Sequence, residues 1–507
     1  MHQRQAIVNA QQMQQIEARL FDAGMPVAAL MEKAAELVFR QIIQLYPHPQ
    51  QVGVLVGPGH NGGDALVIAR ELFLRGFGVL LHSPLNKRKE LTQAHWQYAQ
   101  HLGIPVVEAI EALKDCDLII DGLFGFGLTR PITVPLATGI EQLNQYTMAK
   151  VSVDLPSGLH TDTGEVLGTA FAADHSFCLG LWKLACFQDR ALDYLGQPHL
   201  VEFGIPEADI QAVLGDCPPI QEMTAEAARM SLPAPRPPVT HKYKQGHLLL
   251  VCGSQRYAGG AILTGLGARA SGVGMLSIAV PESLKPLLVS QLPEALIIAC
   301  PETKTGAIAS LPDEVTLENY SAIACGPGLS LDTQTVVKQS LEAPCPLILD
   351  ADGLNLLAQL HPLATLSQRK HPTILTPHLG EFKRLFPDIS PENPLEAAQT
   401  AVEKSQVILL LKGAKTAITG PEPPLWLIGE STPALARGGS GDVLTGLMGG
   451  LLAQPTPPRV SLPQQVATAA WWHAQAGLRA ARNRSELGVD AVTLAQELNS
   501  VLAALDF

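Results

Sequence analysis

Aromatic and charged residues are both scarce in this sequence of 507 residues. Phe, Trp and Tyr make up 5% of the chain and Asp, Glu, Lys and Arg make up 16%, whereas hydrophobic residues make up 47%. This balance is ordinary for packed α/β domains. A chain of this length exceeds what one hydrophobic core supports, so we expect two or more domains.

The sequence also lacks any excess of positive charge. Its formal net charge is −12, and no basic stripe or RNA-stacking motif is visible. Nucleic acid binding depends on lysine and arginine at phosphates, so the composition argues against nucleic acid as the main partner. An acidic chain still binds anionic nucleotides through backbone N–H groups and a few lysines.

No CxxC pair occurs among the eight cysteines, and no long uncharged apolar run is present. Cys252, Cys325 and Cys345 lie in apolar, strand-like runs, which predicts buried free thiols in a reducing compartment. No signal-peptide-like apolar segment begins the sequence, and no run is long enough to span a bilayer. We therefore expect a cytoplasmic protein with no membrane partner.

Strand-like and helix-like segments alternate in the first half. Apolar strands are expected within 51–59, 77–83, 116–125 and 150–158, with helices at 62–76 and 89–103 between them. This order predicts a parallel sheet covered on both faces, in which ligands bind beyond the C-terminal strand ends. Five polar residues fall at those ends: Asn61, Asp64, Asp121, Asp154 and Ser157.

A proline-rich stretch separates the two halves. Residues 216–246 hold a short helical piece and then several prolines, which predicts an extended linker over 216–240. After it, apolar strands again end in glycine or polar residues, as in 247–254, 321–330 and 346–355. The chain is therefore predicted to hold two α/β domains, at 1–215 and 241–507.

The stretch ALARGGSGDVLTG (434–446) places four small residues before Asp442 and an apolar helix-like run. Glycine-rich turns at helix starts bind phosphate, because free N–H groups and the helix dipole point at the anion. A carboxylate there can activate a hydroxyl that attacks a phosphoryl group. The alternative is that Asp442 only caps the helix.

Three other motifs belong with this turn in the second half. KGAKT (412–416) offers lysines for phosphate, TPHLGEF (376–382) offers His378 and Glu381, and CGPGLS (325–330) brings backbone close to a ligand. Each has a plain alternative, namely a solvated hairpin, a structural histidine and a tight turn. A single nucleotide and substrate cleft explains all four together, and the absence of GxxxxGK[ST] excludes a P-loop enzyme.

Two glycine-rich motifs stand in the first half. VGPGHNGGDALV (56–67) follows a strand and opens a helix, and DGLFGFGLTRP (121–131) is a loop at a strand end. VDLPSG (153–158) places Asp154 beside a proline turn, where a carboxylate can move protons or simply cap the turn.

Taken as sets, these motifs carry two family resemblances. The second half, over 240–507, resembles the ADP/ATP-dependent NAD(P)H-hydrate dehydratases of the ribokinase-like superfamily. The first half, over 1–215, resembles the NAD(P)H-hydrate epimerases of the YjeF N-terminal family. Fusion in this order resembles the bifunctional bacterial nicotinamide-nucleotide repair enzymes. The resemblance implies an N-terminal Rossmann-like three-layer αβα domain and a C-terminal ribokinase-like αβα domain.

The resemblance also implies roles for individual residues. Asp154 and Asp442 match proton-transferring, catalytic carboxylates, and Asn61, Asp121 and Ser157 match a K+ site. Substrate contacts in the first half match His60, Asn61, Gly62, Gly63, Asp64, Gly125, Phe126, Gly127, Leu128, Thr129, Arg130 and Pro131. Substrate contacts in the second half match Gly328 and His378. The nucleotide site matches Lys412, Gly413, Ala414, Lys415, Thr416, Gly438, Gly439, Ser440 and Gly441.

Two departures from the family pattern are visible. The family loop NNGGDG reads HNGGDA here, so Ala65 stands where glycine is usual and would distort the loop if its φ were positive. Ser330 likewise replaces the glycine that follows GPGL.

The implied activity is repair of hydrated NADH and NADPH. One domain interconverts the two epimers of the hydrate, and the other phosphorylates the ring hydroxyl of the S epimer and expels phosphate, using Mg2+ with ADP or ATP. Resemblance to bacterial bifunctional proteins favours ADP, and domains of this kind favour a homo-oligomer. One alternative is a ribokinase-like kinase for a sugar or vitamin precursor, with an accessory N-terminal domain. Another is that the first domain is a non-catalytic protein- or RNA-binding module that keeps the fold.

Overall fold

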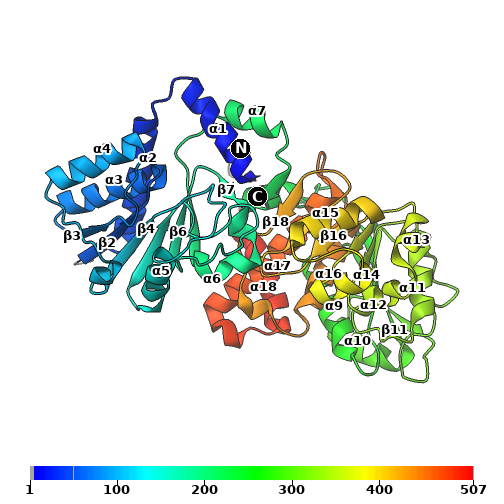
Figure 1. Cartoon of the computed structure of the whole chain (residues 1–507). Coiled ribbons are helices and arrows are strands. Elements are labelled where there is room, and N and C mark those ends of the chain that lie inside the picture. Colours follow the sequence, from blue (N-terminus) through cyan, green and yellow to red (C-terminus); the bar gives the residue numbers. More distant parts are fainter. Residues whose placement is uncertain (1–4, 49–50, 506–507) are drawn as a thin grey trace. The chain divides into compact units, whose positions relative to one another are not determined.

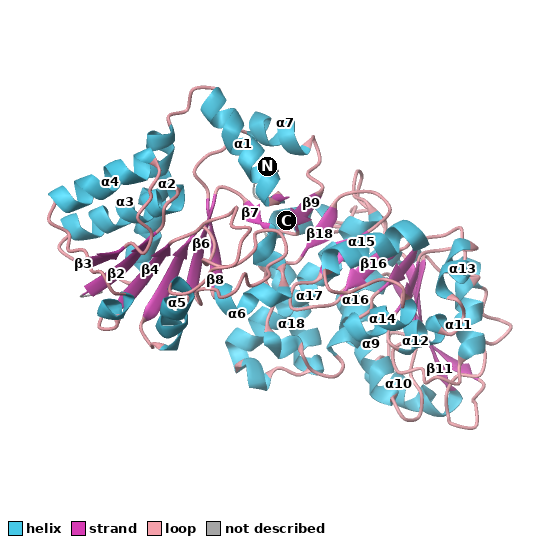
Figure 2. Cartoon of the chain, in the orientation of Figure 1, coloured by secondary structure: helices cyan, strands magenta, loops and turns pink. Residues whose placement is uncertain are grey.

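The computed structural model describes residues 5–48 and 51–505, and it divides the chain into two compact units, 1–219 and 220–507. Both units alternate helices and strands along the chain (Figures 1 and 2). Each unit has its own sheet and its own hydrophobic clusters. The expected α/β class with two domains is confirmed.

The first unit is built on one parallel sheet of six strands in the order β3-β2-β4-β5-β6-β8. Neighbouring strands pair in parallel throughout, with Val56 opposite Gly122 and Asp121 opposite Ser152. The C-terminal ends of the three adjacent strands β2, β4 and β5 therefore meet at one edge. The strands are β2 (Gln51–Val56), β3 (Gly78–His82), β4 (Leu118–Gly122), β5 (Ala149–Val153), β6 (His175–Leu179) and β8 (Gln197–Val201).

Alternating side chains of these strands supply two cores, one on each face of the sheet. Val54, Ile120 and Val153 belong to one cluster, and Leu55 and Ile119 belong to the other. Buried strands that carry apolar residues on both faces need helices on both sides, which produces three layers. The helices are α1 (Ala10–Asp22), α2 (Val27–Leu45), α3 (His60–Leu74), α4 (Glu90–His101), α5 (Leu136–Gln145), α6 (Leu192–Leu195) and α7 (Glu207–Leu214).

A second, two-stranded sheet joins the start of the chain to residues that follow β6. β1 (Ile7–Val8) pairs in parallel with β7 (Trp182–Lys183). Sequence patterns did not indicate these short strands, nor the helices α1 and α2.

The second unit holds a sheet of ten strands in the order β12-β11-β10-β13-β14-β15-β16-β17-β18-β9. All its pairs are parallel except β16–β17 and β17–β18. The strands are β9 (Ile220–Glu222), β10 (His247–Val251), β11 (Met275–Pro281), β12 (Leu296–Cys300), β13 (Ala322–Cys325), β14 (Leu347–Leu349), β15 (Thr373–Leu375), β16 (Ile408–Leu411), β17 (Ala417–Thr419) and β18 (Leu425–Leu427).

Helices again cover both faces of this sheet. Leu248 and Leu250 face a core shared with α9, α16, α17 and α18, whereas Leu249 and Val251 face a core shared with α11, α12, α14 and α15. The helices are α8 (Ala225–Ser231), α9 (Ala258–Ala270), α10 (Lys285–Gln291), α11 (Gln334–Leu341), α12 (Asp352–Ala358), α13 (Pro362–Ser367), α14 (Leu379–Leu385), α15 (Pro394–Ser405), α16 (Ser440–Ala453), α17 (Leu462–Arg484) and α18 (Ala491–Ala503).

The stretch 216–240 differs from the extended linker that its prolines predict. Ile220–Glu222 pairs in parallel with Leu425–Leu427 at the edge of the second sheet. The helix Ala225–Ser231 places Ala227 and Ala228 in the core beside α17. Irregular chain lies at 216–219, which holds two prolines, and from Leu232 to Thr240, where the other prolines lie.

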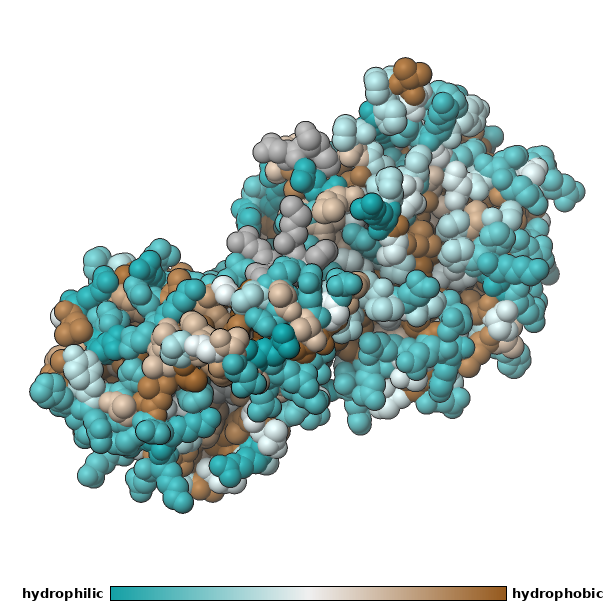
Figure 3. Space-filling model, turned by 90° about the horizontal axis from the view of Figure 1, so that it is seen from above, coloured by the Kyte–Doolittle hydropathy of each residue, from teal (hydrophilic) through white to brown (hydrophobic). Residues whose placement is uncertain are grey.

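Surface and thiol properties agree with a packed α/β chain. The face in Figure 3 is largely hydrophilic, with apolar side chains scattered in small groups. Seven cysteines are buried free thiols, as expected, whereas Cys217 is exposed. Within 5–48 and 51–505, no helix is both long and apolar enough to cross a membrane.

Candidate active sites

The ends of β2, β4 and β5 bring together the five polar residues expected at the first site. Asp121 lies within the end of β4, and Asp154 and Ser157 follow β5. Asn61 lies in the first turn of α3 and Asp64 in the next turn, shortly after the end of β2. The parallel register explains this convergence, because adjacent strands end at the same edge.

Asp154 is the most constrained residue of this site. Its backbone adopts a left-handed conformation with φ of 68°, and only 3% of the residue is exposed. The Oδ1 atom accepts hydrogen bonds from Lys183 Nζ at 2.7 Å and from the Leu179 N–H at 3.3 Å. The Oδ2 atom accepts one bond, from the Phe126 N–H at 2.8 Å. Strained backbone of this kind persists where the surroundings enforce it, often at functional sites.

Gly125 leaves open space beside Oδ2. A Cβ on Gly125 would lie 2.9 Å from Asp154 Oδ2 and 3.2 Å from Asn61 Oδ1. The glycine therefore allows the loop 125–131 to cross the carboxylate closely while leaving that oxygen accessible. The rest of the loop, through Pro131, is mostly exposed.

Asp121 and Ser157 form a buried hydrogen-bonded pair beneath the loop. Ser157 donates from Oγ to Asp121 Oδ1 at 2.7 Å and from its backbone N–H to Oδ2 at 2.8 Å. Burial raises the pKa of Asp121 to about 6, against hydrogen bonds from Ser157, Leu123 and Ser152 that lower it. Beside this pair, the buried Nδ2 of Asn61 has no hydrogen-bond partner.

Two further carboxyl groups face this cluster. Burial, reinforced by Asp154 and Glu17, raises the pKa of Asp64 well above its ordinary value. Burial raises the pKa of Glu17 on α1 to about 7, with a contribution from Asp154, while Lys183 and Lys89 oppose the shift. The site therefore holds carboxyl groups that are protonated or titrating near neutral pH beside an ion-paired one.

Ala65 causes no distortion of the loop. It lies inside α3 and is fully buried, and a Cβ on Gly122 would come within 2.2 Å of its methyl group. Gly57 and Gly62 are required instead, since a Cβ on Gly62 would lie 2.1 Å from the Gly57 carbonyl oxygen. The family glycine at position 65 is thus replaced at a helical position, where alanine is favourable.

The second site forms where two helices start side by side. Glycines let α9 and α16 touch along their backbones, since a Cβ on Gly267 would lie 2.1 Å from the Val443 carbonyl oxygen and one on Gly446 would lie 1.8 Å from the Thr264 carbonyl oxygen. At their N-terminal ends, a Cβ on Gly260 would lie 3.5 Å from both Asp442 Oδ2 and Gly328 Cα. Asp442, Gly328 and the start of α9 therefore line one space.

Asp442 is not the cap of its helix. The N-cap of α16 is Gly439, with φ of 91°, and Asp442 lies two residues inside the helix. Burial raises the pKa of Asp442 to about 7, with contributions from Asp350 and Asp352, whereas Lys412 opposes the shift. A carboxylate with a pKa near the working pH suits a general base.

Lys412 is paired with Asp350 rather than with Asp442. Its Nζ lies 2.5 Å from Asp350 Oδ1, and Thr445 donates to Asp350 Oδ2 at 2.6 Å. Burial acts to raise the pKa of Asp350, but Lys412 and these hydrogen bonds outweigh it and hold the pKa below its ordinary value. Asp350 is 2% exposed and stays charged at neutral pH.

The glycine turn before α16 is open to a ligand. Nothing lies within 4 Å of a Cβ built on Gly438, and the first N–H groups of α16 have no side-chain cap. The buried His473 supports this turn through Nε2, which lies 2.9 Å from the Ser440 carbonyl oxygen. Burial lowers the pKa of His473 to about 4, so it is neutral here.

The other expected residues of the second site lie on neighbouring strand ends. Residues 412–416 form the hairpin between β16 and β17, and Lys415 Nζ bonds the Gly429 carbonyl oxygen. His378 caps α14 through Nδ1, which accepts from the Gly380 N–H at 2.9 Å, yet 58% of its side chain is exposed. The two alternatives, a hairpin turn at 412–416 and a structural role for His378, thus both describe the local structure. Both positions also remain accessible beside β15 and β16.

Sequence reasoning missed Glu17 and Lys183 at the first site and Asp350, Thr445 and His473 at the second. Asp350 stands at a strand end in the sequence DADGLN (350–355), which was a usable signal. Lys183 is a single lysine in the apolar run GLWKLACF, and Glu17 precedes every motif, so neither had one.

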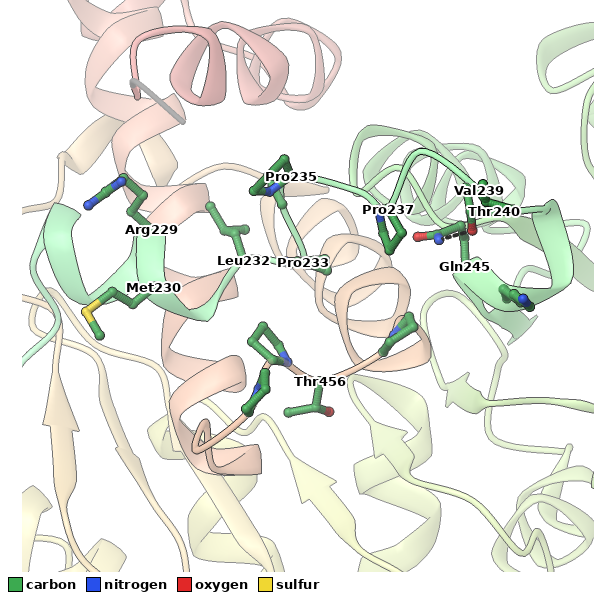
Figure 4. A pocket seen from close by; sticks show the side chains of 15 residues that line it. Arg229, Met230, Leu232, Pro233, Pro235, Pro237, Val239, Thr240, Gln245 and Thr456 are labelled. Atoms are coloured by element: carbon green, nitrogen blue, oxygen red, sulfur yellow. Dashed lines mark hydrogen bonds between the residues drawn. The ribbon is translucent and has the colours of Figure 1, made fainter.

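A large cleft lies apart from both clusters. It has a volume of about 850 Å3 and is lined by 15 residues, including Leu232, Pro235, Val239 and Thr456 (Figure 4). None of the residues expected at either site is among them. Prolines dominate its wall, and no pair of carboxylates or phosphate-binding turn faces it.

Comparisons with known proteins match each half of the chain separately and the whole chain together. The family model of NAD(P)H-hydrate dehydratases matches residues 248–500, and that of YjeF-related protein N-termini matches residues 27–185. A bifunctional NAD(P)H-hydrate repair enzyme from Synechocystis is 59% identical over 97% of this chain and 94% of its own. One from Gloeobacter violaceus is 50% identical over 98% of each chain.

Among solved structures, the ADP/ATP-dependent NAD(P)H-hydrate dehydratase from Bacillus subtilis, co-crystallised with ATP and Mg2+, is 34% identical. It covers 56% of this chain and 97% of its own, with a TM-score of 0.47.

Proposed function

The chain belongs to the family of bifunctional NAD(P)H-hydrate repair enzymes, and from this premise we propose which unit and which residues perform each step. The unit 1–219 interconverts the R and S epimers of hydrated NADH and NADPH. The unit 220–507 dehydrates the S epimer to NADH or NADPH at the expense of ADP or ATP. Family membership favours this reading over a kinase with a stable phosphate ester as product.

The dehydration step starts at Asp442. Its raised pKa lets it accept the proton of the ring hydroxyl at neutral pH, so that the hydroxyl oxygen attacks the terminal phosphorus of the nucleotide. The bond from that phosphorus to the bridging oxygen breaks, and AMP leaves from ADP or ADP leaves from ATP. The new C–O–P bond turns hydroxide into a phosphate leaving group. The ring nitrogen lone pair then expels phosphate, and loss of a proton from the adjacent carbon restores the double bond.

The turn 438–441 and the hairpin 412–416 are proposed to hold the nucleotide. Open N–H groups at the start of α16 stabilise charge on the transferring phosphoryl group, and the helix dipole adds to this. Gly328 and the exposed His378 line the substrate side. Lys412 keeps Asp350 charged, and that charge in turn keeps Asp442 basic.

Magnesium enters this scheme with the nucleotide. Among the described residues, no group of three or more His, Cys, Asp or Glu could hold a metal by itself. Mg2+ is commonly held by phosphates with one or two carboxylates, and that arrangement fits a cleft of scattered acids better than a protein cage does. When bound, it would neutralise charge on the phosphates.

The epimerisation step is assigned to Asp154. Its Oδ2 is the oxygen with spare accepting capacity, and it faces the space left by Gly125. The loops 60–64 and 125–131 are proposed to hold the substrate around it. A carboxylate there removes and returns the proton that accompanies opening and closing of the hydrated ring.

A potassium ion is proposed to support the substrate loops. The residues that would hold it are Asn61, Asp121 and Ser157, all of which carry oxygen donors of the type that hard cations prefer. Asp121 is the single carboxylate among these three residues, which suits a monovalent charge, and the amide oxygen of Asn61 would be the donor from that residue. The ion would supply a fixed positive charge and order the loop ends.

This proposal depends most on Asp442, which lies between the starts of α9 and α16 and has a pKa raised to about 7. The test is incubation of the pure S epimer with ADP or ATP and Mg2+. We expect equal amounts of free phosphate and reduced dinucleotide, and faster turnover with ADP. A stable phosphate ester without free phosphate would overturn the dehydratase assignment. Assembly into a homo-oligomer and a cytoplasmic location stay predictions.

A further inference from the structure

Lys183 is a charged residue buried without an assigned role. Its side chain has no exposed surface, and it belongs to β7, which is paired with β1 at the start of the chain. Burying a lysine is costly unless a partner compensates the charge. Here the partner is the one carboxylate to which we assign epimerisation.

The lysine ties three segments of the site together. Its Nζ lies 2.7 Å from Asp154 Oδ1 and also donates to the Leu179 carbonyl oxygen at the end of β6. The ammonium lies 5.4 Å from the centre of the Phe126 ring, on the loop 125–131. All three contacts leave the opposite oxygen, Oδ2, on the side of Gly125.

The two oxygens of Asp154 are therefore unequal. Oδ1 takes the ion pair and the Leu179 N–H, whereas Oδ2 takes only the Phe126 N–H. A carboxylate that is only 3% exposed is costly without a charged partner, and Lys183 Nζ at 2.7 Å is that partner. Burial lowers the pKa of Lys183, but Asp154, together with Cys178 and Glu17, outweighs it and raises that pKa.

We propose that Lys183 is a positioning residue of the epimerase site, which compensates the buried charge of Asp154 at Oδ1 and turns Oδ2 toward the substrate. This inference rests on the assignment of epimerisation to Asp154. Lys183 lies beneath Asp154, with no exposed surface, so it acts through that carboxylate. The predicted signature is a loss of kcat with substrate binding retained.

The second buried lysine of the same unit offers a matched control. Lys150 lies on β5, the strand that ends next to Asp154, and is 7% exposed. Its Nζ donates to the Tyr146 and Met148 carbonyl oxygens at 2.7 and 3.1 Å. Among the described residues this Nζ makes no ion pair with a carboxylate, although the Lys150 backbone N–H donates to Asp174 Oδ2 at 2.8 Å. Lys150 lies near the opposite end of the strand, about 13 Å along the chain from Asp154.

The experiment compares Lys183→Met, Lys183→Arg and Lys150→Met in the full chain. Epimerisation of the R epimer is measured by NMR, and dehydration of the S epimer quantifies the folded second unit in each sample. Amide hydrogen exchange of β5 and β6 reports folding of the first unit. We expect Lys183→Met to lower epimerase kcat on the order of 10²-fold with KM little changed.

Lys183→Arg keeps the charge but changes its geometry, so we expect a smaller loss of kcat, about tenfold. Lys150→Met should keep wild-type kcat per folded chain. Wild-type kcat in Lys183→Met, or an equal loss in Lys150→Met, would overturn the inference. If Lys183→Met does not fold, Lys183→Arg decides, and a wild-type kcat there overturns it. Absence of epimerase activity in the wild type would instead refute the proposed function itself.

Discussion

The two sites use the same architecture with opposite electrostatics. Each lies at the C-terminal ends of parallel strands, next to a glycine-rich turn that opens a helix, and each contains a lysine–aspartate ion pair whose aspartate is buried. In the first site the paired residue, Asp154, is the proposed working carboxylate. In the second site Lys412 is paired with Asp350, and the proposed base is their neighbour Asp442.

The pKa of Asp442 is raised mainly by burial, and the negative charge fixed at Asp350 adds to the shift. Asp350 itself contacts Lys412 directly, and its pKa is held below the ordinary value. The first site thus pairs its proposed working carboxylate with a lysine, whereas the proposed base of the second site lies beside such a pair and has a pKa of about 7.

The largest expected effect separates the two sites completely. Asp442→Asn removes the base, and dehydration of the S epimer should fall by about 10²-fold or more, as measured by phosphate release. Epimerisation should continue at the wild-type rate. Asp490→Asn is the control, because Asp490 starts α18 and bonds the Thr493 N–H at 2.8 Å. A near-normal dehydration rate in Asp442→Asn would remove Asp442 from the mechanism.

Removal of potassium should affect the first site and leave the second site active. Replacing K+ by a bulky organic cation should lower epimerase activity by about tenfold, because the substrate loops lose a fixed charge of about one unit. Dehydration assayed in the same buffers should change little. Equal sensitivity of both reactions would show that the ion does not act at Asn61, Asp121 and Ser157.

How far the sequence predicted these sites depends on how local each signal is. Asp121 and Asp154 were predictable because each directly follows an apolar strand, and parallel strands end together. Asp442 directly follows the glycine-rich turn 438–441, so a short stretch of sequence is enough to identify it. Lys183 was not predictable, because its partner lies 29 positions earlier in the chain and only folding brings them into contact.

The structure excludes one of the helix-cap interpretations and agrees with the other. The cap reading of Asp442 fails because Gly439 holds the N-cap position. The cap reading of His378 describes its Nδ1 correctly, and its function depends on the exposed remainder of the ring. The short helix before Leu232 was expected within the linker, whereas the strand Ile220–Glu222 was not, so the predicted linker begins too early.

The pH dependence of dehydration tests the coupling between Asp350 and Asp442. The base works in its ionised form, so the rate should rise with pH through about 7. Asp350→Asn removes the charge that raises the pKa of Asp442, and the remaining Lys412 lowers it. The rising limb should therefore move to lower pH, with about two- to fivefold more of the plateau rate below pH 7. A rising limb at the same pH as in the wild type would show that Asp350 does not raise the pKa of Asp442.

Backbone strain gives the smallest predicted effect. Asp154 in the first site and Ser330 near the second both have left-handed backbones, with φ of 68° and 80°. Ser330→Gly removes that strain at a position where relatives of this family use glycine, so the second unit should gain roughly 0.5–1 kcal/mol in its free energy of unfolding. Chemical denaturation measures the gain. A loss of stability would mean that the Ser330 side chain contributes more than its backbone costs.

The most direct measurement follows a mixture of R and S hydrates with excess ADP or ATP and Mg2+, using the near-ultraviolet absorbance of restored dinucleotide. The wild-type chain should consume both epimers without a slow second phase. Asp154→Asn should consume the S epimer at the wild-type rate and the R epimer only as fast as it interconverts spontaneously. Identical time courses for the two proteins would contradict the assignment of epimerisation to the first site.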